Sequence, residues 1–192
     1  MFSDLFGQIH FAYIFVSSLF FIAGIYLAPS VVDRNIKWLL IYPRWVAKLM
    51  EKYFSKRWGF LPIFFTILIL NNISLFTGFL SGFLIIFPLI LAFLTGFNVA
   101  VIGYDLMGWQ GIWHLLVNPV AWLEFPASWI SFGMGLRLAV VSLQYRSYAV
   151  TKQIFSNILP LYFKYVFTLL VIAAIIESLL IVIAERNKDK FQ

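Results

Sequence analysis

The amino-acid sequence predicts an all-α fold, a polytopic membrane helix bundle of about five transmembrane helices plus one amphipathic, basic interfacial helix. Hydrophobic residues make up 62% of the chain and charged residues 11%, whereas a soluble domain is roughly half apolar and about a quarter charged. The apolar residues also gather in five segments long enough to cross a bilayer, which takes ~20 residues. A chain of 192 residues with this balance cannot hide its apolar surface in one aqueous core. We therefore expect residues 1–192 to form a single integral membrane domain.

The predicted spans cover residues 11–28, 60–80, 83–105, 123–143 and 159–184. The first ends before Pro29, and its leader carries Asp4 in place of a positive region, so we expect a retained helix and not a cleaved signal peptide. Residues 44–58, after Pro43, place Arg and Lys on one helical face and aromatic and aliphatic residues on the other. This pattern is typical of a helix in the membrane interface, although the same face could dock a partner helix.

Several spans carry small residues at four-residue spacing, which allows helices to approach closely. These sets are Gly24 with Ala28, Ala92 with Gly96 and Ala100, and Ser131 with Gly135 and Ala139. Between the third and fourth spans, residues 107–118 are too few to cross a bilayer. We expect them to form an interfacial or re-entrant turn that carries His114.

Positive charge predicts the orientation in the cell membrane. Seven of the 14 Lys and Arg lie between Arg34 and Arg57, and three more lie in the tail after Glu185. Basic loops stay in the cytoplasm, so five spans put the N-terminus outside and the C-terminus in the cytoplasm. The same basic groups are typical of anchoring at the membrane surface, and we expect no nucleic-acid partner.

Ionisable and amide side chains within the spans are the candidate functional residues, because such groups are costly in a membrane. At a rise of ~1.5 Å per residue, several of them fall in the predicted cytoplasmic half and could form one polar intramembrane cluster. Its expected members are Asn71, Asn72, Asn98, Glu124 and Glu177, with Asp105, His114 and Arg137 as further candidates. Arg137 lies about 20 Å along its helix from Glu124, so we do not expect the two to pair directly. The cluster could hold the helices together by hydrogen bonds, or it could bind a cation or relay a proton.

Catalytic and metal chemistry find little support in the sequence. The chain has no cysteine and two histidines, and it contains neither a His-Glu-x-x-His motif nor a Ser-His-Asp arrangement. We therefore expect no catalytic residue, no metal and no cofactor.

The order of these signals resembles the stage II sporulation protein M family over about Phe60 to Leu180. The resemblance rests on Asn71-Asn72, Asn98 with Gly103, Pro119 five residues before Glu124-Phe125-Pro126-Ala127, Gly135-Leu136-Arg137, and Ala173-Ala174-Ile175-Ile176-Glu177. The family's central motif reads Pro-His-Gly-x-x-Glu-Leu. In this chain Val120, Ala121 and Phe125 stand at the His, Gly and Leu positions.

The resemblance implies a non-enzymatic integral membrane protein that acts as a scaffold or partner subunit, in the family within an envelope or peptidoglycan-remodelling complex. The expected partners are the lipid bilayer, further copies of the chain in a homo-oligomer, and other membrane or envelope proteins. An alternative is a small ion or solute transporter that uses Glu124, Glu177 and Asn98. An intramembrane hydrolase is a remote alternative.

Overall fold

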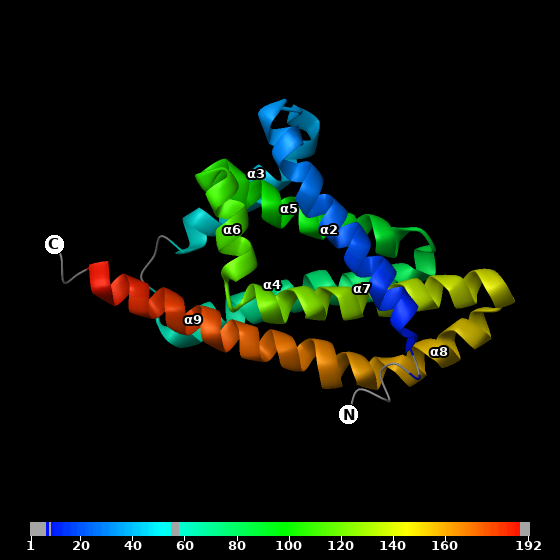
Figure 1. Cartoon of the computed structure of the whole chain (residues 1–192). Coiled ribbons are helices and arrows are strands. Elements are labelled where there is room, and N and C mark those ends of the chain that lie inside the picture. Colours follow the sequence, from blue (N-terminus) through cyan, green and yellow to red (C-terminus); the bar gives the residue numbers. More distant parts are fainter. Residues whose placement is uncertain (1–6, 8, 55–57, 189–192) are drawn as a thin grey trace.

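The computed structural model describes residues 7, 9–54 and 58–188, and within them the chain is helical with no strand. Five helices are long and apolar enough to span a membrane: Phe11–Asp33, Phe60–Leu84, Phe87–Met107, Ala121–Tyr145 and Tyr148–Ala184. The predicted all-α membrane bundle with five spans is therefore confirmed. Figure 1 shows α4, α7 and α9 running along one another, with α2 and α5 crossing above them.

Helices α2 (Phe11–Asp33) and α5 (Phe87–Met107) form the closest pair, and each contributes one of the predicted faces of small residues. A Cβ atom added at Gly24 would lie 2.7 Å from the backbone nitrogen of Phe97, and one added at Gly96 would overlap the backbone of Phe21. Contact this close between two backbones requires glycine on both helices. Ala28 and Ala92 are fully buried beside these glycines.

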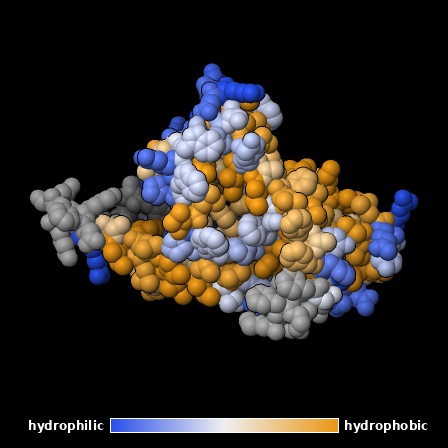
Figure 2. Space-filling model, in the orientation of Figure 1, coloured by the Kyte–Doolittle hydropathy of each residue, from blue (hydrophilic) through white to orange (hydrophobic). Residues whose placement is uncertain are grey.

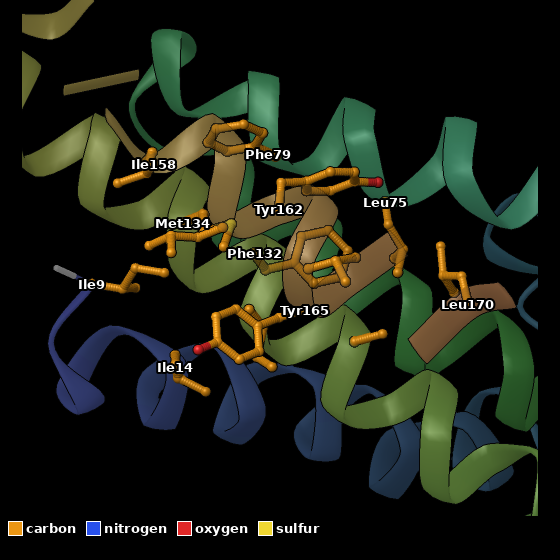
Figure 3. Packing of buried hydrophobic residues seen from close by; sticks show 14 of the residues in the cluster. Ile9, Ile14, Leu75, Phe79, Phe132, Met134, Ile158, Tyr162, Tyr165 and Leu170 are labelled. Carbon is orange, nitrogen blue, oxygen red and sulfur yellow. The ribbon is translucent and has the colours of Figure 1, made fainter. Parts of the chain in front are cut away.

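The second half of the core lies between α4 (Phe60–Leu80), α7 (Ala121–Tyr145) and α9 (Thr168–Lys188). Phe79 stacks on the ring of Tyr162 with centroids 5.7 Å apart, and both side chains are fully buried together with Phe132 and Met134 (Figure 3). The Ser131 hydroxyl donates a 2.6 Å hydrogen bond to the carbonyl oxygen of Leu75. Apolar packing and a hydroxyl bond thus hold α7 against α4.

Prolines did not end helices where the sequence suggested. Helix α2 continues past Pro29 to Asp33, beyond the predicted end at residue 28. Helix α3 (Lys37–Phe54) begins seven residues before the predicted start at residue 44 and carries Pro43 inside it; residues 55–57 of the predicted helix lie outside the described part. A proline inside a helix removes one backbone hydrogen bond, and both helices nevertheless continue through their proline.

The remaining boundaries also differ from the predicted ones. A 3₁₀ turn, η1 (Ser81–Leu84), extends α4, so the next helix starts at Phe87 and not at residue 83. Residues 107–118 include a nine-residue helix, α6 (Trp109–Val117), and α7 extends two residues beyond the predicted span at each end.

The last span begins 11 residues earlier than the predicted start at residue 159. It consists of α8 (Tyr148–Leu161), a π-helical turn η2 (Tyr162–Phe167) and α9. Its 37 residues would measure about 55 Å at ~1.5 Å per residue, well beyond a hydrocarbon core of ~30 Å. Since α9 alone is long enough to cross the bilayer, we expect α8 to lie at the edge of the membrane.

The distribution of hydrophobic and hydrophilic side chains on the surface agrees with a protein that spans a membrane. Hydrophobic side chains cover the flanks of α7 and α9, whereas hydrophilic atoms gather at the α2–α3 connection and at the end where α7 meets α8 (Figure 2). Many large apolar side chains are more than half exposed, among them Leu61, Phe65 and Ile73 on α4. In a bilayer these side chains contact lipid tails, so their exposure carries no penalty.

Candidate functional site: a polar cavity between the helices

A cavity of about 530 Å³ lies among α3, α4, α5, α6, α7 and α9. Its volume falls within the range of ordinary small-molecule sites. Most of its wall is apolar, and a few polar side chains project from different helices. These are Asn71 and Ser74 of α4, Thr95 and Asn98 of α5, His114 of α6, Asn118, Glu124 of α7 and Glu177 of α9.

Glu124 occupies the first turn of α7. The side-chain oxygen of Asn118 accepts a 3.0 Å hydrogen bond from the backbone nitrogen of Val120, which fixes the turn that leads into the helix. The amide of Asn71 donates a 2.5 Å hydrogen bond to Oε1 of Glu124. A carboxylate is favourable at this place, because the first turn of a helix presents unpaired N–H groups and a positive dipole end. Local turn chemistry and one long-range bond thus hold Glu124 in position.

A second, smaller cavity of about 80 Å³ also borders Glu124, Asn71 and Ser74. Thr95 and Ser128 line it as well, and their hydroxyls bond to the carbonyl oxygens one turn earlier in their own helices, at 2.7 and 2.8 Å. A polar space of this size has room for water. Glu124 therefore borders both the large cavity and the small one.

Glu177 reaches the large cavity from α9, the last helix. Among the described residues its carboxyl group has no hydrogen bond and no ion pair. Neighbouring Ser178 is fully buried and bonds to the carbonyl oxygen of Ala174 at 2.6 Å. Of the two acids, Glu124 has an amide partner and Glu177 keeps its whole hydrogen-bonding capacity for the cavity.

The structure brings most of the predicted polar residues to this cavity but not Asn72. Asn71, Asn98, Glu124 and Glu177 line it together. The side chain of Asn72 instead accepts a 3.0 Å hydrogen bond from the hydroxyl of Tyr162, in the core between α4 and η2. Adjacent residues on a helix point about 100° apart, and here the rotation of α4 turns Asn71 to the cavity and Asn72 to Tyr162.

The three further candidates lie in different places. His114 lines the cavity. Asp105 instead forms a two-pronged ion pair with Arg44, at 2.7 and 2.9 Å, which ties α3 to α5 and raises the pKa of the Arg44 guanidinium through the hydrogen bond. Arg137 borders a separate cavity near α8, away from Glu124.

Several cavity residues were not identified from the sequence. Tyr42, Val46 and Met50 of α3 cover one side of the cavity, and nothing in their local pattern distinguishes this role from contact with lipid. Gly103 and Gly111 also line it. A Cβ at Gly103 would lie 3.3 Å from the carbonyl oxygen of Gly111, so the paired glycines let α6 fold back on α5. The sequence contains these two glycines eight residues apart, and this spacing could have indicated the contact between α5 and α6.

The chemistry of the cavity is that of an uncompensated acidic pair. No Lys or Arg is among its lining residues, and no group of three His, Cys, Asp or Glu among the described residues could hold a metal ion. Two carboxyl groups and three amides can hold a proton, or a monovalent or organic cation, by charge and hydrogen bonds.

Comparison with known proteins identifies the family. Residues 17–180 match the family described as stage II sporulation protein M. No curated protein and no solved structure matches the chain. The matched range includes every residue of the polar cavity and all five spans in whole or in part. The chain is therefore a multi-pass membrane protein that belongs to the stage II sporulation protein M family.

Proposed function

We propose that the protein is a non-enzymatic membrane scaffold that binds a partner protein, and that a positively charged group of the partner enters the polar cavity. The single observation that carries this proposal is that Glu124 and Glu177 face one cavity without any lining Lys or Arg. Two acids in a membrane are costly unless a positive charge or a proton accompanies them. A partner can supply that charge.

The shape of the cavity supports a protein partner. Tyr42, Val46 and Met50 of the amphipathic helix α3 form one wall, and α3 is attached through the exposed Arg44–Asp105 pair. Leu40 of α3 is also buried in an apolar cluster with α2, α5 and α6, so we expect the partner's charged group to enter the cavity beside α3 without displacing that helix.

Site-specific crosslinking in native membranes tests the scaffold proposal. A photoreactive residue in place of Val99, which lines the cavity, should yield one stoichiometric crosslinked partner. The adduct should be lost in the double variant Glu124→Gln with Glu177→Gln. It should persist in Glu51→Gln, which makes the same change at an exposed site on α3. Equal crosslinking in the double variant would contradict the proposal.

A second candidate is a small cation or solute transporter, favoured by the adjacent cavity of about 80 Å³ that extends the polar space at Glu124. Purified protein in liposomes would then carry a cation flux, and Glu177→Gln would abolish it while Glu51→Gln would not. Flux without any crosslinked partner would favour the transporter. A crosslinked partner without flux would favour the scaffold.

A further inference from the structure

A further cavity of about 530 Å³ lies between α7 and α8 and shares no lining residue with the acidic cavity. Arg137 of α7 lines it, with Ser156 and Asn157 of α8 on the same wall. Nη1 of Arg137 is buried and has no hydrogen-bond partner among the described residues. A guanidinium has five N–H donors and no acceptor. Arg137 makes no hydrogen bond and no ion pair with the described residues, so an anion with several oxygens in the cavity could accept hydrogen bonds from its free donors.

The charged residues around this cavity also favour an anion. The exposed residues Arg146 and Lys152 lie nearby in sequence, on the turn before α8 and in its second turn. The acidic side chains that the structure describes lie elsewhere, on the end of α2, on α3, on the end of α5, and around the polar cavity. They are Asp33, Glu51, Asp105, Glu124 and Glu177. No described carboxylate is available to neutralise Arg137 locally.

The position of the cavity relative to the membrane indicates which kind of anion can reach it. Arg137 is eight residues before Tyr145, the end of α7, which is about 12 Å of helix. An arginine side chain can extend several ångströms toward the headgroups. The span of α8, η2 and α9 is longer than the bilayer is thick, so we expect α8, which lines this cavity, to lie at the membrane edge. Its exposed Ser156 and Asn157 add hydroxyl and amide donors at that level.

We propose that Arg137, Ser156 and Asn157 bind the phosphate group of an anionic phospholipid, with Arg146 and Lys152 favouring a lipid of net negative charge. Guanidinium and phosphate match in geometry and form two parallel hydrogen bonds. The lipid tails lie along the apolar flank of α7 and α8, which free phosphate cannot use.

Lipid titration of the full-length, detergent-purified chain tests the site. Phosphatidylglycerol should bind at least about tenfold more tightly to the native chain than to Arg137→Gln, since a charged hydrogen bond is worth roughly 1.5–3 kcal/mol and ~1.4 kcal/mol corresponds to tenfold. Arg137→Lys should fall between, because lysine keeps the charge but loses the planar fork. Arg34→Gln, an exposed arginine beyond the far end of α2, should bind like the native chain.

A second variant leaves Arg137 intact. Asn157 is exposed on α8, so Asn157→Trp should fill the cavity without disturbing the core and should weaken phosphatidylglycerol to a similar degree. Unchanged binding in both Arg137→Gln and Asn157→Trp would overturn the proposal. So would equal binding of phosphatidylcholine, or displacement of the lipid by inorganic phosphate at equal concentration, which would indicate a site for free phosphate.

Discussion

The hydrogen bond between Asn71 and Glu124 gives the sharpest test of the polar cavity. The two residues are 53 positions apart in the chain, and their side chains meet at 2.5 Å between α4 and α7. Replacing Asn71 by Ala removes the donor and leaves a half-buried carboxyl oxygen without its partner. Leaving such a group unsatisfied costs about 1–3 kcal/mol, and hydrogen bonds between membrane helices average about 0.6 kcal/mol with a maximum near 1.7.

We therefore expect Asn71→Ala to lower the free energy of unfolding by about 1–2 kcal/mol, working between these two ranges. For a chain of this size the midpoint of thermal unfolding should fall by roughly 2–8 °C. Asn98→Ala is the matched control. It also removes an amide from the cavity wall, but Asn98 makes no hydrogen bond with the described residues, so the midpoint should change little.

A double-mutant cycle isolates the bond. Asn71→Ala, Glu124→Ala and the double variant are compared by thermal unfolding in detergent, and the double variant should lose about 1 kcal/mol less than the sum of the single ones. Strictly additive losses would refute the reasoning, because they would mean that the two side chains do not interact in the folded protein.

Three further predictions address packing and orientation. Gly24→Ala should destabilise by about 1–3 kcal/mol in thermal unfolding, because its Cβ would overlap the backbone of α5, whereas Gly59→Ala, where nothing lies within 4 Å, should not. Tyr162→Phe should cost only about 0.6 kcal/mol, the mean for such hydrogen bonds, and Tyr162→Ala about 3–5 kcal/mol through the cavity it leaves; equal losses would contradict the packing in Figure 3. Since the chain has no native cysteine, a cysteine at Lys190 should react with an impermeant maleimide only from the cytoplasmic side, and labelling from outside would reverse the predicted orientation.

Sequence patterns were informative wherever one physical constraint dominates. Apolar length predicted all five spans, because a bilayer core demands about 20 apolar residues of any helix that crosses it. Small residues at four-residue spacing predicted faces on which helices can approach closely, and the structure shows that two of these faces, on α2 and α5, contact each other. Helix rise alone predicted that Asn71, Asn72, Asn98, Glu124 and Glu177 lie in the same half of the membrane. The structure adds that all of them except Asn72 line one cavity.

Helix boundaries were less predictable, because packing competes with local preference there. Pro29 and Pro43 suggested breaks, yet both lie inside helices. Tyr148 to Leu161 is polar enough to resemble a loop, with Lys152, Gln153, Ser156 and Asn157 in it, but it is helical against α7. A single lost hydrogen bond or a few polar residues change the local free energy by less than the contacts of a whole helix.

By itself, the sequence determined that this protein is a helical membrane protein of five spans, where its costly polar residues fall in depth, and which helix faces are small enough to meet. Those properties depend on residue type and spacing along one helix. Only the tertiary structure decided which polar residues share a cavity, that Asn72 bonds to Tyr162, that Asp105 pairs with Arg44, and that Arg137 borders a cavity of its own. These outcomes depend on the rotation and crossing of helices about their axes, which many side-chain contacts set jointly and no single motif records.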